Sequence, residues 1–208
     1  MDKPYVSAAN HKIEPGHDHW INLNHTPEPR LGPIGAPVIL LQLNPSYSRH
    51  ELNGRLSTAR RDRDLESVRD DEHSHLGVTE HDEWWNPRLR QLISDVGEKQ
   101  LAAGLCSIEF FPYRSRAFSH GCLRLPSQEY TFSIVRAGIR RGAIFIITRN
   151  YRLWISAVPE LHGQLNKTVY VLNNPRSSYL TDTNLPRNVY PQLVAAISRV
   201  GGLDSERE

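Results

Sequence analysis

The chain has 208 residues, of which 38% are hydrophobic, so it is long enough for one domain that buries roughly 70% of its unfolded surface. Its net charge of +2 neither requires nor excludes a polyanionic partner. No run approaches the ~20 apolar residues of a membrane span, the N-terminus lacks the apolar core of a signal peptide, and two cysteines are too few for a disulfide framework or an iron–sulfur cluster. We therefore expect a soluble, cytoplasmic protein that needs no cofactor.

The basic residues are mostly arginines. Only four of the 25 basic residues are lysines, at positions 3, 12, 99 and 167. Arginine makes bidentate contacts to phosphate and stacks on bases, so this bias agrees with a nucleic-acid partner. A genome of high G+C content would produce the same bias, and both explanations stay open.

Residues 1–35 are rich in His, Pro, Asn and Gly without apolar periodicity, which predicts an extended N-terminal arm laid over the domain. Within this arm, His17 and His19 could share one face of an extended chain and bind a metal. Neither a cysteine nor a second matched pair completes a ligand set, so we predict no metal site. The alternative is a solvated arm that Trp20 and Ile21 anchor to the core.

The apolar run from Val38 to Leu43 predicts a central parallel strand that is buried on both faces. Pro45 cannot extend the hydrogen-bonded ladder and holds Asn44 out of the α region, so the chain must turn there. Open α/β sheets place their ligand crevice at this end of such a strand. Asn44 is therefore the first candidate site residue, although the same residues would also make a simple turn.

Residues 49–82 are mostly charged, with both signs closely mixed. Such a segment is usually a solvent-facing helix or a mobile loop held by weak ion pairs. Because it directly follows the turn at Asn44, it could also be a lid over the crevice that becomes ordered when a ligand binds. The sequence leaves both possibilities open.

Helix and strand patterns alternate through the rest of the chain. Asn86 as an N-cap, Pro87 at the first helical position and Gly97 as the stop predict the first crossover helix. Further strands are predicted at 103–111, 143–148 and 168–172, and further helices at 127–141, through Trp154 to about Leu161, and from about Tyr190 to Val200.

This alternation predicts the α/β class, as a three-layer α/β/α sandwich with a central, mainly parallel four-stranded sheet. The domain spans residues 36–200, and residues 201–208 form a polar tail. Because the carboxyl ends of parallel strands lie at one edge of a sheet, the polar turns that follow the four strands are expected to converge. These turns are Asn44-Pro45-Ser46, 112–115, Arg149-Asn150 and 174–177.

Two of these turns resemble motifs of the uracil-DNA glycosylase superfamily. Gln42-Leu-Asn-Pro-Ser46 resembles the first family motif, which has forms such as Gly-x-Asn-Pro-Gly after the first core strand. Asn174-Pro-Arg176 stands where the second motif, often His-Pro-Ser, follows the last core strand. Segments 107–113 and 144–148 also look like the family, so the resemblance covers about residues 36–200. It implies the fold described above and hydrolysis of the N-glycosidic bond of a modified or deaminated base.

Such a reaction needs residues that position a water molecule beside the sugar, donate hydrogen bonds to the leaving base and bind the extruded nucleotide. The resemblance implies that Asn44 positions the water and that Asn174 donates a hydrogen bond to a base carbonyl, as the family's histidine does. Arg176 would contact a phosphate or enter the gap left by the flipped base. Gln42 and Ser46 replace family glycines and narrow the entrance for the nucleotide.

Five further side chains are candidates for contact with the base or the nucleic acid. Phe111 or Tyr113 could stack on the base, which is worth about 1–3 kcal/mol per base, but core packing of Phe111 and a surface turn at Tyr113 are the alternatives. Arg114 and Arg116 flank the tyrosine, as expected of a nucleic-acid contact or of ordinary surface arginines. Ser177 could bind a phosphate or cap its turn.

The leading hypothesis is therefore a hydrolase that recognises a base in DNA, RNA or a free nucleotide. A second hypothesis is a non-catalytic module that binds a nucleotide or nucleic acid on the same fold, favoured by the replaced glycines and by the lack of a carboxylate in the first motif. A third is a protein-interaction domain that uses exposed Trp84 and Trp85 or the charged segment 49–82. No membrane partner is expected.

Overall fold

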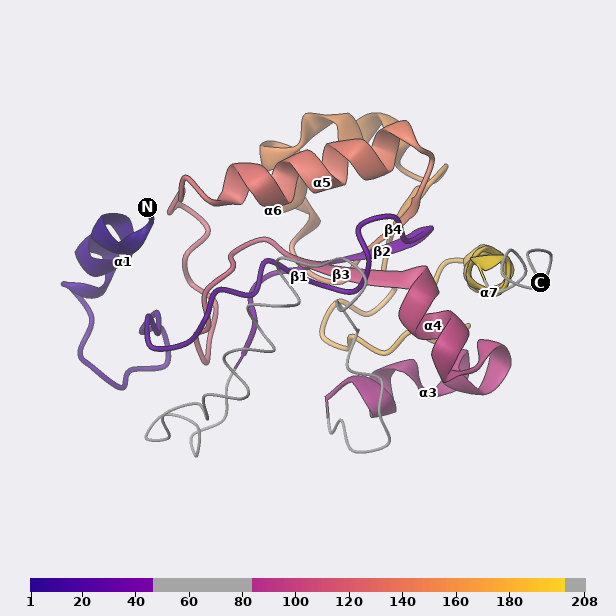
Figure 1. Ribbon diagram of the computed structural model, residues 1–208, viewed down its shortest axis with the longest axis horizontal. Helices are drawn as coiled ribbons and strands as arrows, with labels where there is room; N and C mark the ends of the chain where they lie inside the picture. Colours follow the sequence, from indigo (N-terminus) through magenta and orange to yellow (C-terminus); the bar gives the residue numbers. More distant parts are fainter. Residues whose placement is uncertain (47–83, 201–208) are drawn as a thin grey trace, which may run out of the picture.

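The computed structural model of the chain describes residues 1–46 and 84–200. The predictions for the charged segment 49–82 and for the tail 201–208 lie outside these residues. Helices pack around one mostly parallel sheet, which confirms the α/β class (Figure 1). No helix within the described ranges is long and apolar enough to cross a membrane.

Five strands form the sheet in the order β1-β3-β2-β4-β5. They are β1 Arg30–Leu31, β2 Val38–Gln42, β3 Leu105–Glu109, β4 Ile144–Ile147 and β5 Val169–Val171. β2 to β5 pair in parallel, whereas β1 is antiparallel to β3. The prediction of four strands is therefore wrong by one. β1 has two residues, which is too few for the alternation of apolar and polar side chains that predicts a strand.

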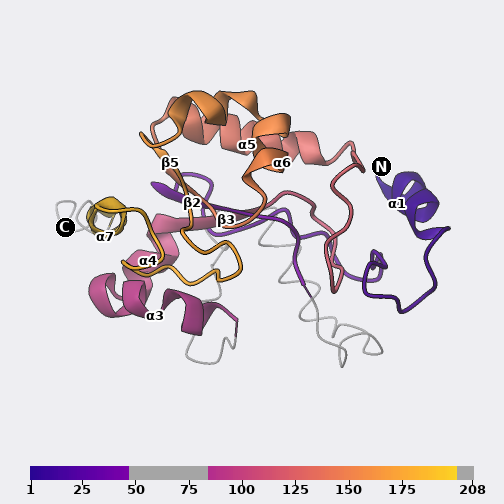
Figure 2. The same cartoon turned by 180° about the vertical axis from the view of Figure 1, so that it is seen from behind.

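The helices cover both faces of this sheet (Figure 2). They are α1 Lys3–Asn10, α3 Trp85–Val96, α4 Glu98–Gly104, α5 Gln128–Arg140, α6 Tyr151–Ala157, the 3-10 helix η2 Pro159–Gln164 and α7 Val189–Ser198. α5 and α6 pack on one face of the sheet, and α3, α4 and α7 pack on the other. The sheet therefore lies between two helical layers.

Three predictions about the arm, the second strand and the first crossover helix need correction. The arm was expected to be extended, but it begins with α1, whose Val6 is fully buried. The strand expected from residue 103 starts at Leu105, because α4 occupies the preceding residues. Gly97, at φ 83°, ends α3 as predicted, and α4 follows it directly. α3 itself begins at Trp85, which places Asn86 inside its first turn.

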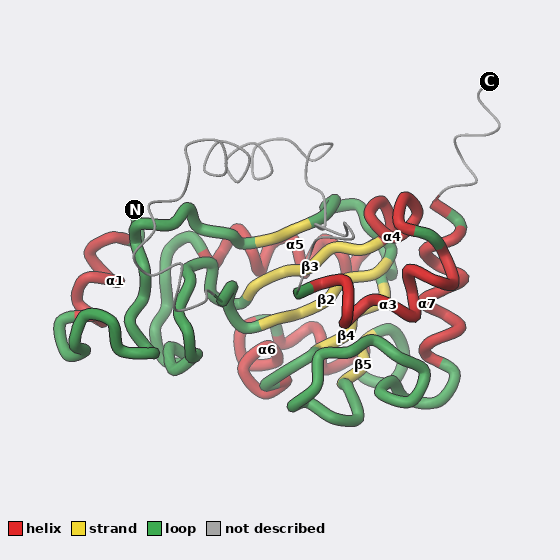
Figure 3. Tube along the Cα trace, turned by 90° about the horizontal axis from the view of Figure 1, so that it is seen from below, coloured by secondary structure: helices red, strands yellow, loops and turns green. Residues whose placement is uncertain are grey.

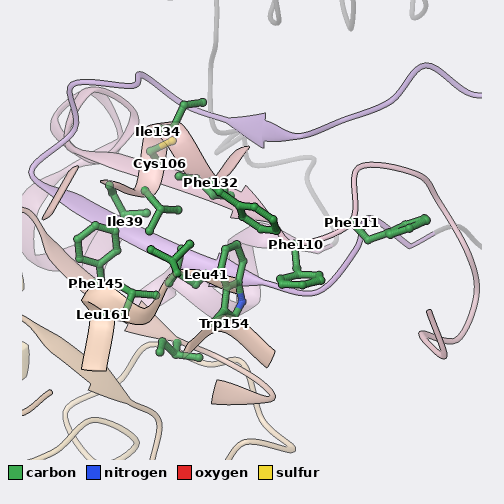
Figure 4. Packing of buried hydrophobic residues seen from close by; sticks show 14 of the residues in the cluster. Ile39, Leu41, Cys106, Phe110, Phe111, Phe132, Ile134, Phe145, Trp154 and Leu161 are labelled. Atoms are coloured by element: carbon green, nitrogen blue, oxygen red, sulfur yellow. The ribbon is translucent and has the colours of Figure 1, made fainter. Parts of the chain in front are cut away.

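β2 is the central strand that its apolar run predicts. Ile39 and Leu41 pack towards α5 and α6 (Figure 4). Val38 and Leu40 pack on the opposite face, towards α3, α4 and α7. All four side chains are at most 1% exposed. Such burial on both faces explains why the run is continuously aliphatic rather than alternating.

The N-terminal arm lies at the carboxyl edge of the sheet, where α1 is displaced well beyond the strand ends (Figure 3). Backbone hydrogen bonds join the arm to β3 and to the turn after it: Glu109 N to Pro29 O at 2.9 Å, and Glu28 N to Pro112 O at 2.8 Å. A further bond runs from Asn22 N to Arg114 O at 2.9 Å. The arm therefore forms one wall of the edge at which the candidate site residues lie.

Candidate functional site

The four parallel strands end at one edge, in the order β3, β2, β4, β5. Asn44 follows β2 by two residues and Asn174 follows β5 by three. Only β4 separates their strands, which corresponds to about 10 Å between strand axes at normal sheet spacing. Two turns that are 130 residues apart in sequence thus lie at the same edge of the sheet.

Asn44 ties the turn after β2 to the turn after β3. Its Nδ2 donates to Pro45 O at 3.0 Å, to Ser115 O at 3.2 Å and to Ser115 Oγ at 3.0 Å. These bonds fix the orientation of a half-buried amide. Among the described residues no group donates to Asn44 Oδ1, so this carbonyl oxygen is an oriented acceptor at the sheet edge.

Gln42, the last residue of β2, is held from both its side chain and its backbone. Thr148 Oγ1 lies 3.2 Å from Gln42 Oε1 and 3.1 Å from Leu41 O, so its single proton is shared between these two acceptors. Trp154 Nε1 donates to Gln42 O at 3.0 Å. With its oxygen occupied, the side chain presents Nε2 as a donor that has no partner in the part of the chain that is described. The edge of β2 thus offers an oriented acceptor and, two residues earlier, an oriented donor.

Glu109 is a further candidate, which the sequence analysis did not select. It is the register partner of Gln42 on β3, so both side chains lie on the face of the sheet that α3 covers. The residue is 8% exposed, and within the described ranges its Oε2 has no hydrogen-bond partner. A glutamate in an otherwise buried strand is unusual enough to have marked it from sequence.

The Glu109 carboxyl holds its proton to higher pH than an ordinary glutamate. Burial raises its pKa well above the ordinary 4.5, the charge of Glu28 raises it further, and the nearby Arg114 partly opposes both effects. In its neutral state this carboxyl can donate a hydrogen bond but cannot act as a general base.

This neutral state predicts how stability varies with pH. In unfolded chains Glu109 ionises near 4.5, whereas in folded ones it keeps its proton to higher pH. Proton binding to Glu109 therefore stabilises the folded protein fully below the unfolded pKa. This contribution to the free energy of unfolding is lost as pH rises towards the folded pKa, at up to about 1.4 kcal/mol per pH unit. Glu109→Gln cannot ionise, so its melting temperature should rise relative to wild type between pH 4.5 and pH 8. A difference between the two melting curves that is the same at every pH would contradict a neutral Glu109.

Ser115 and His120 extend the hydrogen bonds of Asn44 into the loop after β3. His120 Nε2 lies 3.3 Å from Ser115 Oγ, and its ring packs 5.2 Å from the ring centre of Phe111. Burial, together with the charge of His19, lowers the pKa of His120 to about 4. At neutral pH this imidazole is uncharged, so it supports Ser115 without adding charge to the edge.

Phe111 and Tyr113 are both buried. Phe111 is fully buried between Tyr113, Phe118 and His120, which is the core-packing alternative left open by the sequence. The Tyr113 hydroxyl donates to Asp2 Oδ2 at 3.1 Å, and its pKa is raised to about 12 by burial and by the charge and hydrogen bond of Asp2. Stacking of either ring on a base would require the arm to move.

The two arginines that flank Tyr113 are bound within the chain. Arg114 pairs with Glu28 at 2.6 Å, with both side chains less than 15% exposed, and also donates to Ser46 O at 2.7 Å. Arg116 pairs with Asp18. Both arginines therefore fasten the arm to the turn after β3, whereas the side chain of Ser46 remains exposed.

The turn after β5 is more open. Asn174 and Arg176 are exposed and Ser177 is half-buried. Asn174 Oδ1 accepts from Arg176 N at 3.1 Å, and Asn174 N donates to Asn184 Oδ1 at 2.9 Å. Asn184, a buried residue that sequence reasoning missed, also donates to Ser177 O at 3.0 Å. The turn is thus rigid in its backbone but accessible in its side chains.

The histidines of the arm form no complete metal set in this structure. His17 and His19 have ring centres 5.1 Å apart, but His17 Nδ1 accepts from His19 N and His19 Nδ1 contacts Ala117 O. No group of three or more His, Cys, Asp or Glu side chains within residues 1–46 and 84–200 is arranged to hold a metal ion.

Comparison of the chain with protein-family models, with curated proteins and with solved structures finds no match in any of the three. The geometry of the carboxyl edge is therefore the basis for inferring a function.

Proposed function

We propose that the protein is a divergent relative of the uracil-DNA glycosylases that recognises a nucleobase in nucleic acid and hydrolyses the N-glycosidic bond of a modified or deaminated base. The observation that carries this proposal is the pair of oriented amides at the end of β2. Asn44 presents its Oδ1 and Gln42 presents its Nε2, each held by hydrogen bonds from its other atoms. An acceptor beside a donor matches the edge of a nucleobase.

The proposed reaction places one of these amides on each side of the breaking bond. Asn44 Oδ1 accepts a hydrogen bond from a water molecule, whose oxygen bonds to the anomeric carbon of the sugar. The bond from that carbon to the base nitrogen breaks, and its electron pair leaves with the base. Gln42 Nε2 stabilises the negative charge on the base by donating to a base carbonyl, and the water loses its proton to solvent. An amide contributes orientation rather than proton removal.

A second candidate function is a reader that binds the base without cleaving it. It is favoured by the raised pKa of Glu109, because a carboxyl that holds its proton cannot remove one from water. It is also favoured by the ion pairs of Arg114 and Arg116, which close the arm over the turn after β3. The third hypothesis loses one of its two tryptophans, because Trp85 is only 6% exposed and was wrongly expected at the surface.

The test is to measure binding and base release in parallel, on single- and double-stranded oligonucleotides that carry uracil, hypoxanthine or an oxidised purine. Gln42→Leu removes the proposed donor and should weaken binding of the recognised base by about 5- to 150-fold, the value of one good contact to a base edge. Gln192→Leu, at an exposed glutamine of α7, is the matched control and should bind as wild type.

The outcomes separate the candidates. Release of one base, reduced in Gln42→Leu, supports the hydrolase. Base-selective binding without release supports the reader. Two results would overturn base recognition at this edge. Wild type and Gln42→Leu would either bind every oligonucleotide equally well, or bind no oligonucleotide at all.

A further inference from the structure

An arginine joins two exposed aromatic side chains outside the site described above. Trp84, just before α3, is 45% exposed, and Tyr179, after β5, is 43% exposed. The guanidinium carbon of Arg88 lies 3.5 Å from the ring centre of Trp84 and 5.6 Å from that of Tyr179. We call Trp84, Arg88 and Tyr179 the aromatic platform.

The platform is held in place by hydrogen bonds. Arg88 Nε donates to Ser178 Oγ at 2.9 Å, and Arg88 NH1 donates to Trp84 O at 2.7 Å. The backbone of Leu180 donates to Arg88 O at 2.9 Å. Because these bonds connect α3 to the segment after β5, the two rings are presented on a rigid support and would lose little entropy on binding a ligand.

The platform lies close in sequence to the turn after β5. Tyr179 follows exposed Arg176 by three residues, and Arg176 belongs to that turn. On the other side of Tyr179, an open hollow of about 480 Å³ is lined by Pro87, Arg90, Gln91 and Thr181, among others. A hollow of this size falls within the range of small-ligand sites, about 300–1,000 Å³.

The chemistry of this surface fits an unpaired nucleotide better than an apolar protein segment. Bases stack on aromatic rings whatever their sequence, and exposed Arg90 and Arg176 can meet phosphates. Besides apolar surface, the hollow offers the amide of Gln91 and the hydroxyls of Ser94 and Thr181, which can form hydrogen bonds to a base edge. Among the residues that the structure describes, Asp95, which accepts from Tyr190 at 2.6 Å, and exposed Asp182 are acidic groups near this hollow, so we expect stacking to supply more of the affinity than charge.

We infer that the aromatic platform binds single-stranded nucleic acid, by stacking an unpaired nucleotide that flanks the base held in the crevice. The inference rests on the proposed function only for the position of that nucleotide. Binding of plain single strands by Trp84 and Tyr179 does not depend on any recognised base.

The test uses the full-length protein and fluorescein-labelled oligothymidines of 4, 8 and 12 nucleotides, which carry no modified base, with a 12-base-pair duplex for comparison. Trp84→Ala and Tyr179→Ala should each raise the dissociation constant for the single strands by about 5- to 150-fold, the loss of one stacking contact. Trp84→Phe keeps an aromatic ring and should cause a smaller loss. Tyr5→Ala removes an equally exposed tyrosine from α1 and should leave binding unchanged.

Tryptophan fluorescence gives a second readout. Single strands should quench the emission of wild type, and most of this quenching should be lost in Trp84→Phe, because Trp85 and Trp154 are buried and half-buried Trp20 lies on the arm. Unchanged affinity in Trp84→Ala and Tyr179→Ala, an equal loss in Tyr5→Ala, or tighter binding of the duplex would each overturn the inference. If these variants lose affinity for oligothymidine while Gln42→Leu binds every base as wild type does, the platform stands and the proposed function fails. If Trp84→Ala and Tyr179→Ala bind oligothymidine as wild type does while Gln42→Leu loses affinity for the recognised base, the platform fails and the proposed function stands.

Discussion

Replacing Asn44 by alanine is expected to lower the rate of base release by about 100-fold or more. The carbonyl oxygen of Asn44 is aimed by the bonds of its own Nδ2 to Ser115 and Pro45. Alanine removes both the oxygen and its anchors, so the water under the sugar loses its fixed position, and misplacement by about 1 Å is enough for such a loss. The measurement is single-turnover release from the oligonucleotide that wild type cleaves fastest.

Two controls separate chemistry from folding in this experiment. Ser115→Ala keeps Asn44 but removes one of its anchors, so it should lose less activity than Asn44→Ala. Asn24→Ala, at an exposed asparagine of the arm, should release base as wild type does. Full release by a folded Asn44→Ala protein would exclude Asn44 from the reaction. In a reader, the same substitution would instead weaken base binding, with no release by either protein.

The position of Asn44 could be predicted because local rules determine it. A buried parallel strand needs continuous aliphatic residues, and Pro45 must end it, so the turn at the carboxyl edge follows from adjacent residues alone. The convergence of this turn with the one at Asn174 needs only the parallel pairing of β2, β4 and β5. The turn at Asn44 and each of these strands can be recognised from patterns within a few residues.

The closure of the arm could not be predicted in this way. Tyr113 binds Asp2, Arg114 binds Glu28 and Arg116 binds Asp18, each pair separated by more than 80 residues. No periodicity records such a pairing, and charged residues near an aromatic look the same in sequence whether they face solvent or each other. The side chains selected for nucleic-acid contact at this turn are therefore those that the arm binds.

The burial of Glu109 depends on tertiary structure for the same reason. Its position at the end of a predicted strand is visible in the sequence, but the pKa of its carboxyl follows from burial and from Glu28, a residue of the arm. Short elements are similarly hidden: β1 forms only because Arg30 and Leu31 lie beside β3. A two-residue strand has no pattern of its own.

Replacement of Trp154 by alanine is expected to have the largest effect on stability. Trp154 is fully buried on α6 and packs edge-on against Phe110 and Phe132, with ring centres 5.1 and 6.2 Å away. Removing a buried tryptophan costs about 3–5 kcal/mol, because it leaves a cavity as well as lost contacts. The melting temperature should fall by about 6–20 °C for a domain of this size. Thermal denaturation followed by circular dichroism measures this, and Trp84→Ala at the surface should lose only about 1 kcal/mol.

Trp154→Phe then links this core to the site. Phenylalanine keeps most of the buried ring but removes the Nε1 donor to Gln42 O, a carbonyl that also accepts from Phe110 N at 3.2 Å. Because that carbonyl keeps a partner, the lost bond should cost only about 0.5–1.5 kcal/mol of stability. If Gln42 reads the base, loosening the end of β2 should weaken base-selective binding while affinity for oligothymidine at the aromatic platform stays constant. Equal losses at both places would mean that Trp154 acts through general stability, whereas a loss confined to the recognised base would show that α6 positions the donor at the carboxyl edge.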